Sequence, residues 1–237
     1  MRVEVWSDVV CPWCYIGKRR FETALAQLSK TTDTSSIQVV YRAYQLDPTA
    51  PPGTAQPVAQ AYAKKFGGPE RAREILDHVT GIAAADGITF NMDRALRANT
   101  LLAHRLLWYT AELDNAAGTS LQASLHERLL RAYFTEGENI GDNDVLIRCA
   151  TQVGLSHDEV VRFLDSDEGR AEVMQELAQA AAHGITAVPT FVFDNTWSVP
   201  GAQDVTVFES ILTRLLDESA PVSAAPGGMG RDDASNC

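Results

Sequence analysis

Two cysteines separated by two residues, in the CPWC motif Cys11-Pro12-Trp13-Cys14, have the clearest chemistry in this sequence. A C-x-x-C pair is either a redox-active dithiol or one half of a zinc site. A closed structural zinc site needs four ligands, usually as two such pairs, whereas Cys149 and Cys237 each stand alone. The spacing therefore favours thiol–disulfide exchange, and we expect no metal ion and no tightly bound cofactor.

The elements expected around the motif give its two thiols different roles. Residues 3–6 alternate like a strand, and apolar positions recur at helical spacing from about residue 12 to 28. Cys11 then lies at a helix N-terminus, where unpaired N–H groups and a partial positive charge stabilise a thiolate. We expect Cys11 to be the exposed nucleophile and Cys14, one turn further on, to be the buried resolving thiol.

The rest of the chain predicts how this strand and helix are completed. Residues 37–44 are β-branched and aromatic, which indicates a second strand, and the pattern from 58 to 183 is almost entirely helical apart from a hint of extended chain at 88–90. Strands are expected at 188–194 and 197–199, followed by a helix through residue 216 that Asp204 caps. Neither outer piece can form a sheet alone, so the two must pair. The predicted fold class is α/β: a thioredoxin fold (βαβ…ββα) interrupted by a large all-helical insertion.

This layout predicts three parts. Residues 1–57 and 184–218 form the thioredoxin-like domain, and residues 58–183 form the helical insertion domain. Residues 219–237 are rich in Ala, Pro, Gly, Ser and Asp and are expected to be a disordered tail.

Composition excludes several classes of partner. The formal net charge is −11 and no cluster of Lys and Arg is visible, which argues against nucleic acid and against an anionic membrane surface. No stretch is long and apolar enough to cross a bilayer. The first residues lack the basic start and apolar run of a signal peptide, which predicts a cytoplasmic location. In that compartment four cysteines are not expected to form a disulfide framework.

Pro189 is the second candidate site residue, because it opens a strand directly after the helical insertion. An X-Pro bond adopts the cis form at small cost, although an edge-strand proline is the plainer alternative. In a thioredoxin fold a cis proline faces the dithiol, and the backbone of the preceding residue, here Val188, pairs with substrate. We therefore expect a cis Val188–Pro189 bond close to Cys11 and Cys14.

Several stretches resemble DsbA-family thiol–disulfide oxidoreductases of the FrnE-like branch: residues 7–18, 44–48, 99–105, 132–134, 185–191 and 199–203. That branch is similar in architecture to 2-hydroxychromene-2-carboxylate isomerases and kappa-class glutathione transferases. The resemblance covers about residues 3–216. The glutathione-using relatives carry serine at the first cysteine position, so the presence of both Cys11 and Cys14 favours redox chemistry.

The resemblance implies a cytoplasmic thiol–disulfide oxidoreductase that works through a mixed disulfide with a protein or small-molecule thiol/disulfide substrate, as a monomer or homodimer. It implies a substrate surface with Pro12, Trp13 and Val188. It also implies a pocket facing Cys11 and lined in part by Asn99, His104 and Arg105. A capped helix with a surface His104–Arg105 pair is the alternative.

Two other functions stay open on the sequence alone. One is an isomerase or glutathione-transferase-like enzyme acting on an aromatic or polyketide small molecule in the helical cleft. The other is a chaperone-like binding module that keeps the fold. Among the remaining residues, Asp8 is either a group that tunes Cys14 or a turn residue. Cys149 is expected to be a buried apolar residue, and His126 to be structural or solvated.

Overall fold

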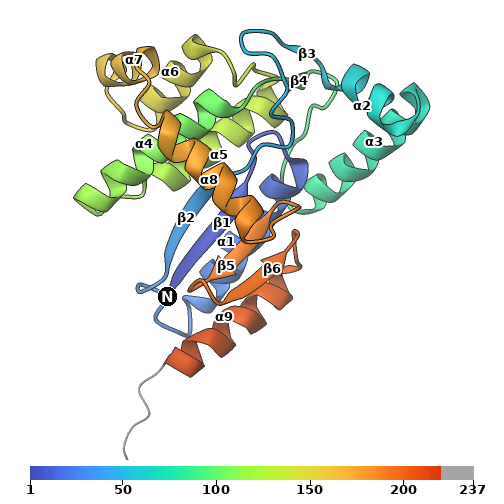
Figure 1. The fold of residues 1–237 in the computed structure, drawn as a ribbon. Coiled ribbons are helices and arrows are strands. Elements are labelled where there is room, and N and C mark those ends of the chain that lie inside the picture. Colours follow the sequence, from blue (N-terminus) through green and yellow to red (C-terminus); the bar gives the residue numbers. More distant parts are fainter. Residues whose placement is uncertain (220–237) are drawn as a thin grey trace, which may run out of the picture.

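The computed structural model describes residues 1–219 and contains one four-stranded sheet built from both ends of the chain (Figure 1). Its order is β2-β1-β5-β6, with β1 parallel to β2 and antiparallel to β5. Val5, in the middle of β1, lies opposite Tyr41 and Phe191. The strands span β1 (Arg2–Ser7), β2 (Gln38–Ala43), β5 (Thr190–Phe193) and β6 (Trp197–Pro200). The pairing of the two outer pieces confirms the predicted thioredoxin fold.

Two helices, α1 (Pro12–Leu28) and α9 (Val205–Ser219), pack against each other beside this sheet (Figure 1). The side chains of a strand alternate between its two faces, so Val3 and Val5 both point toward the buried layer between sheet and helices. Phe21 is central to this layer, with its ring 5.1 Å from that of Phe191 and 5.3 Å from that of Phe208. The C-terminal tail expected from residue 219 onward lies outside the described residues, apart from Ser219 at the end of α9.

The segment between β2 and β5 is mostly helical. Its α-helices are α2 (Val58–Phe66), α3 (Pro69–Ala85), α4 (Leu101–Ala117), α5 (Leu121–Arg131), α6 (Asn143–Gln152), α7 (His157–Asp165) and α8 (Arg170–Ala182), and a π-helical turn, η1 (Ala132–Glu136), follows α5. A small antiparallel pair, β3 (Gln56–Pro57) and β4 (Leu96–Arg97), lies in the same region. The residues at 88–90, where the sequence hints at extended chain, belong to no helix or strand, and Ile88 and Phe90 are buried.

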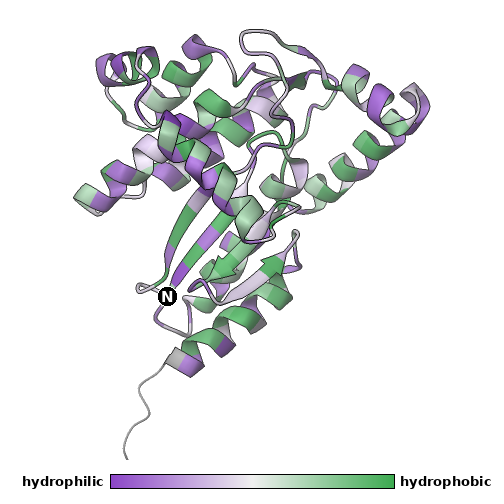
Figure 2. Ribbon diagram, viewed as in Figure 1, coloured by the Kyte–Doolittle hydropathy of each residue, from purple (hydrophilic) through white to green (hydrophobic). Residues whose placement is uncertain are grey.

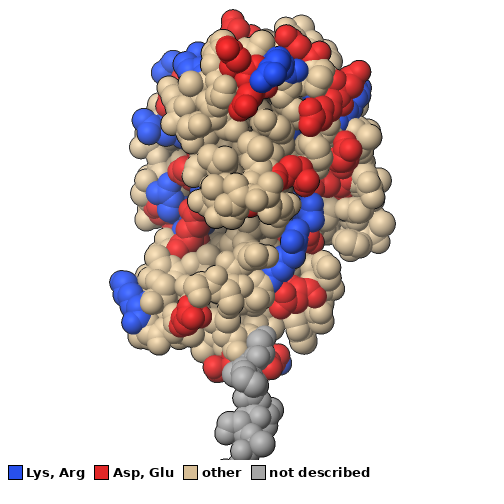
Figure 3. All heavy atoms as spheres, turned by 90° about the vertical axis from the view of Figure 1, so that its left-hand side faces the viewer, with Lys and Arg blue, Asp and Glu red and all other residues tan. Residues whose placement is uncertain are grey.

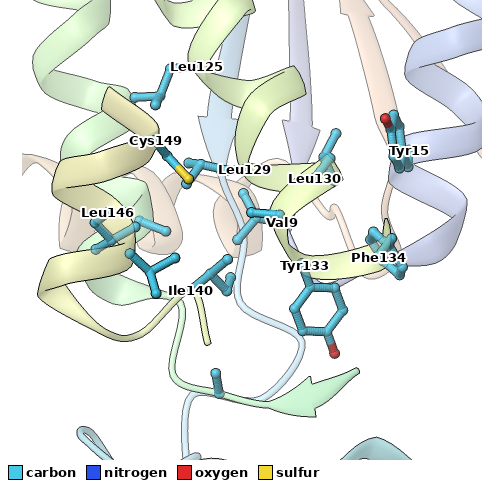
Figure 4. Close-up of a cluster of buried hydrophobic side chains, with 14 of the residues drawn as sticks. Val9, Tyr15, Leu125, Leu129, Leu130, Tyr133, Phe134, Ile140, Leu146 and Cys149 are labelled. Atoms are coloured by element: carbon cyan, nitrogen blue, oxygen red, sulfur yellow. The ribbon is translucent and has the colours of Figure 1, made fainter. Parts of the chain in front are cut away.

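The insertion contributes most of a second hydrophobic core, to which Val9, Tyr15 and Ile16 also belong. Its helices carry apolar residues on one side and polar residues on the other, as the hydropathy colouring in Figure 2 shows. Cys149 is fully buried there beside Leu125, Leu129 and Leu146 (Figure 4), as expected from the sequence. Burial raises the pKa of the Cys149 thiol, so this cysteine is an inert packing residue.

On the face shown in Figure 3, Lys and Arg side chains are scattered among Asp and Glu and form no continuous basic patch. None of the helices within residues 1–219 has the length and apolar character needed to span a bilayer.

Candidate active site

The dithiol lies where β1 ends and α1 begins. Cys11 is the N-cap residue of α1, in an extended conformation, and Pro12 occupies the first helical turn, where no backbone N–H is needed. The N–H of Cys11 donates to the carbonyl oxygen of Asp8 at 3.0 Å, and the N–H of Cys14 donates to the carbonyl oxygen of Cys11 at 3.0 Å. The motif is therefore held at the positive end of the helix dipole, as the sequence predicts.

Both thiols are free and both are buried. Cys11 is 4% exposed and Cys14 is 2% exposed, so the expectation of an exposed Cys11 is wrong. The end of α8 and the segment before Pro189 cover the pair, through a cluster that contains Ala180, Ile185 and Val188. Trp13, between the two cysteines, is 39% exposed and faces solvent instead.

The two thiols differ in their protonation. Burial raises the pKa of Cys14 well above its ordinary value, and the neighbouring Cys11 raises it further by hydrogen bonding and charge. The Ser7 hydroxyl and the backbone of Asp8 act in the opposite direction through hydrogen bonds to the Cys14 side chain. Cys14 is therefore a thiol at neutral pH, which leaves Cys11 as the candidate nucleophile.

Pro189 lies directly against the start of α1. The Val188–Pro189 peptide bond is cis, as the sequence predicts. The thiol of Cys11 donates to the carbonyl oxygen of Val188 at 3.6 Å. A Cβ atom on Gly17 would lie 2.9 Å from Cγ of Pro189 and 3.4 Å from Cα of Ala202, so only glycine allows this approach.

Asp8 anchors the loop that carries the dithiol. The residue is completely buried, and its carboxylate accepts the N–H of Leu46 at 2.8 Å. The other carboxylate oxygen lies 3.2 Å from Nε2 of His104 on α4. The side chain thus ties the loop before Cys11 to the segment after β2 and to the helical insertion.

The pocket expected from Asn99, His104 and Arg105 does not form around these three side chains. The side-chain amide of Asn99 donates to the carbonyl oxygen of Ala50 and accepts the N–H of Leu101. Both hydrogen bonds hold the chain at the start of α4. The predicted surface pair of His104 and Arg105 is also wrong, because both residues are 3% exposed. Of the three, His104 alone makes a hydrogen bond to the loop that carries the dithiol.

Arg105 instead holds the C-terminal end of α7. Its guanidinium donates to three backbone carbonyl oxygens, those of Phe163, Ser166 and Glu168, at distances of 2.6 to 3.2 Å. A helix C-terminus leaves carbonyl groups without intrahelical partners, and the planar guanidinium supplies several donors in a fixed fork. Its role here is structural.

Replacing Arg105 with lysine is expected to lower the free energy of unfolding by about 1–2 kcal/mol, because a single ammonium group cannot satisfy all three carbonyl groups. The rate of disulfide exchange should stay within about twofold of wild type, because the hydrogen bonds of the Arg105 guanidinium within residues 1–219 all go to the end of α7 and the turn after it. Urea unfolding and a turnover assay on the same sample check both values. A large loss of rate with unchanged stability would restore the substrate-binding role.

A cleft of about 490 Å³ lies beside the dithiol loop, and no local sequence pattern predicts its lining residues. Tyr62 on α2 and Tyr133 on η1 line it, and the hydroxyl of Tyr133 points away from the aliphatic core in Figure 4. Burial raises the pKa of Tyr62 to about 12, with a further contribution from a negative charge on Cys11. Burial, and then negative charge on Tyr62, Asp8 and Cys11, raise the pKa of Tyr133 well above its ordinary value. The lining residues are Val10, Leu46, Asp47, Gln56, Val58, Ala61, Tyr62, Lys64, Lys65, Arg97, Ala98 and Tyr133.

The rim of this cleft is locally basic although the whole chain is acidic. Arg97 is neutralised by Asp47, with 2.5 Å between the nearest nitrogen and oxygen atoms. Lys64 and Lys65 on α2 are exposed, and neither makes an ion pair with another residue in the range 1–219. Two uncompensated positive charges therefore stand at the edge of an otherwise mainly apolar cleft.

Comparison with known proteins agrees with this architecture. The family model of the DSBA-like thioredoxin domain matches residues 2–213. The structure of a probable DsbA oxidoreductase from Streptomyces coelicolor has a TM-score of 0.82 and 33% sequence identity, over 100% of this chain and 99% of that one.

Two more distant structures share the fold. The cytosolic disulfide reductase DsbM from Pseudomonas aeruginosa, also solved with GSH, has a TM-score of 0.65 and 17% identity, over 92% of this chain and 100% of that one. A 2-hydroxychromene-2-carboxylate isomerase has a TM-score of 0.62 and 18% identity, over 94% of this chain and 100% of that one. These two structures share the fold that the resemblance in the sequence predicts. With its strand pairing, its dithiol at the start of α1 and a family match over nearly its whole length, this chain belongs to the DSBA-like thioredoxin domain family.

Proposed function

We propose that this chain is a cytoplasmic thiol–disulfide oxidoreductase in which Cys11 and Cys14 form the redox-active pair. The observation that carries the proposal is the position of the Cys11 sulfur. It lies at the N-terminus of α1 and 3.6 Å from the carbonyl oxygen of Val188, which precedes the cis bond to Pro189. A thiol at a helix N-terminus has the setting that favours a reactive thiolate.

The proposed reaction proceeds through a mixed disulfide. The Cys11 thiolate attacks a substrate disulfide, one substrate sulfur leaves as a thiolate, and a disulfide joins Cys11 to the other. Cys14 then attacks the Cys11 sulfur, which forms the Cys11–Cys14 disulfide and releases the second substrate thiol. The reverse sequence oxidises a substrate dithiol. The raised pKa of Cys14 supports this division of roles, because it keeps Cys14 protonated while Cys11 reacts first.

The proposed substrate-binding surface combines the backbone at Val188 with the exposed side chain of Trp13. The Val188 carbonyl group, which now accepts the Cys11 thiol, becomes free to pair with a substrate backbone once Cys11 forms a mixed disulfide. Pro12 is buried and fixes the start of α1, whereas Trp13 offers an exposed apolar surface beside Cys11. A cytoplasmic address is supported by the fold shared with DsbM, described as a cytosolic disulfide reductase.

The cleft beside the dithiol favours a second candidate function, an isomerase or glutathione-transferase-like reaction on a small molecule. It has about 490 Å³ of space, apolar walls and two unpaired lysines at its rim, which suits a small apolar molecule with anionic groups. The shared fold of 2-hydroxychromene-2-carboxylate isomerase and the GSH complex of DsbM point the same way. Against it stands Cys14, which such a reaction would not need.

Trapping on a Cys14→Ser variant tests the proposal and separates the two candidates. Without the resolving thiol, the mixed disulfide on Cys11 should accumulate in cells and survive denaturation, and a reductant should release the partner. Intact mass then shows whether the adduct is a protein or a small thiol. A Cys11→Ser/Cys14→Ser double variant is the control and should trap nothing.

Loss of the adduct in the Cys14→Ser variant, together with full turnover of a small substrate by the double serine variant, contradicts the oxidoreductase proposal and supports the isomerase-like one. Full holdase activity in the double serine variant, without any turnover, supports the chaperone-like binding module instead.

A further inference from the structure

The cleft beside the dithiol loop contains two phenol hydroxyls that have no partner in the protein. Tyr133 on η1 is 2% exposed, and its hydroxyl makes no hydrogen bond within residues 1–219. Figure 4 shows this hydroxyl pointing away from the aliphatic core, and Tyr133 lines the cleft. The partly buried Tyr62 on α2 lines the same cleft, and its hydroxyl is likewise unpaired in that range. Because a buried phenol usually finds a hydrogen-bond partner, both hydroxyls are available to a molecule in the cleft.

Both phenols are hydrogen-bond donors at neutral pH. Burial is the main reason that the pKa of Tyr62 is raised to about 12 and that of Tyr133 well above its ordinary value, so both keep their protons. A protonated phenol donates to a carbonyl or carboxylate oxygen. A polypeptide offers a carbonyl oxygen at every residue, which makes its backbone a suitable partner for these two hydroxyls.

The rim of the cleft concentrates positive charge. The chain has four lysines, and two of them, Lys64 and Lys65, stand side by side at this rim. Both are exposed and neither makes an ion pair within residues 1–219, although the Lys65 ammonium lies 5.5 Å from the centroid of the Phe66 ring. Asp47, the acid among the lining residues, is already paired with Arg97. The rim can therefore attract a carboxylate even though the net charge of the chain is −11.

The apolar surface of the cleft extends beyond the space that a small molecule would fill. Leu46 lines the cleft and is 46% exposed, and Phe66, at the end of α2, is 39% exposed. The cleft also reaches Val10, whose neighbour in the chain is Cys11. A polypeptide joined to Cys11 through its cysteine can lay its neighbouring residues along this surface. A small disulfide would leave Leu46 and Phe66 uncovered, so the surface favours a polypeptide.

We propose that this cleft is a substrate subsite of the exchange reaction and that it selects polypeptides with acidic residues beside the reactive cysteine. Lys64 and Lys65 pair with the substrate carboxylates, and the hydroxyls of Tyr62 and Tyr133 donate to oxygen atoms of the substrate backbone. The inference rests on the proposed exchange at Cys11. Complementary charge speeds the encounter with the right partner and disfavours the wrong one, so the preference should appear in the second-order rate constant.

Peptides with one cysteine between two glutamates, two glutamines or two lysines test this preference. Each peptide is used as its symmetrical disulfide, so that oxidation of the protein dithiol releases two peptide thiols and needs no other reductant. Excess peptide disulfide is mixed with reduced protein and samples are quenched in acid. Alkylation in denaturant followed by intact mass counts the protein thiols that remain, which gives the rate constant. All proteins carry Cys237→Ser to remove a competing thiol.

Wild type should react about fivefold faster with the glutamate peptide than with the glutamine peptide, because two partly exposed ion pairs each contribute modestly. Lys64→Gln/Lys65→Gln should bring this ratio to about one. Lys64→Glu/Lys65→Glu should make the lysine peptide the faster substrate. A general loss of packing would slow all three peptides and could not invert the preference.

Lys30→Glu is the matched control, because it changes the net charge by two units, as Lys64→Gln/Lys65→Gln does. Lys30 is exposed and follows the C-terminal end of α1, a helix roughly 25 Å long that begins at the dithiol. The control should keep the ratio near fivefold. If it lowers the ratio as much as the double variant, overall charge and not the cleft sets the preference, and the inference is wrong.

Tyr133→Phe tests the hydrogen bond to the substrate backbone, since it keeps the ring and removes the hydroxyl. It should lower the rate constant about fivefold for the glutamate and glutamine peptides alike and leave their ratio as in wild type. The loss should be smaller for bis(2-hydroxyethyl) disulfide, which has no peptide carbonyl group. Equal losses for the peptides and this small disulfide, or no loss at all, would overturn the binding role of the hydroxyl.

Three further outcomes decide the matter. Equal rate constants for the glutamate and glutamine peptides in wild type overturn the inference. So does oxidised glutathione, a smaller disulfide with carboxylates, if it reacts as fast as the glutamate peptide and loses as much in Lys64→Gln/Lys65→Gln. A wild type that reduces neither the peptides nor bis(2-hydroxyethyl) disulfide contradicts the exchange reaction itself, so failure of the subsite and failure of the proposed function are distinguishable.

Discussion

Replacing Gly17 with valine is expected to lower the rate of disulfide exchange about 100-fold and the free energy of unfolding by about 2–3 kcal/mol. The reason is the close approach of α1 to the segment that carries the cis bond. Even the first side-chain atom at this position would lie 2.9 Å from Cγ of Pro189, inside ordinary contact distance. A valine must push α1 and Pro189 apart, and that moves Cys11 away from the Val188 carbonyl oxygen.

Gly81 provides the matched control for this substitution. It also lies inside a helix, α3, and a Cβ atom there would meet no atom within 4 Å. Gly81→Val should therefore stay within about 0.5 kcal/mol of wild type and keep the full exchange rate. Urea unfolding and the reduction of a fluorescent disulfide peptide measure the two quantities. If both variants behave alike, the contact between α1 and Pro189 does not position the dithiol.

The parts of the site that lie close together in the sequence were predictable. Cys11, Pro12 and Cys14 predict a dithiol at the start of a helix, because the strand before them and the helix after them each show the apolar spacing typical of that element. The cis bond before Pro189 was predictable from its place at the start of a strand after the insertion. The pairing of the N-terminal and C-terminal strands in one sheet was predictable because neither segment can bury its apolar face alone.

The residues that surround the dithiol were not predictable, because their partners are distant in the chain. His104 meets Asp8 across 96 positions and His126 meets Ser7 across 119, and a single histidine on a helix carries no sign of either contact. The resemblance directed attention to residues 99–105 but could not tell that Arg105 turns toward the carbonyl groups of α7. The cleft joins Val10, α2 and η1 only after folding.

Acid is expected to destabilise this protein through His126. Because the pKa of His126 is held well below its ordinary value, first by burial and then by Lys18 and His104, the folded state keeps this ring neutral. The unfolded chain takes up a proton at the ordinary value near pH 6.5, so it binds more protons than the folded state below that pH. The stabilising contribution is complete above pH 6.5 and is lost as the pH falls toward the folded-state pKa.

Between the ordinary value and the folded-state pKa, the slope of this loss approaches one proton, or about 1.4 kcal/mol per pH unit. His126→Phe removes the titrating group and keeps a ring against Tyr41, while all carboxylates still titrate in both proteins. Urea unfolding at several pH values should therefore show a shallower acid slope for the variant, by close to one proton. Parallel slopes would mean that the buried ring is protonated in the folded state, which would contradict the lowered pKa of His126.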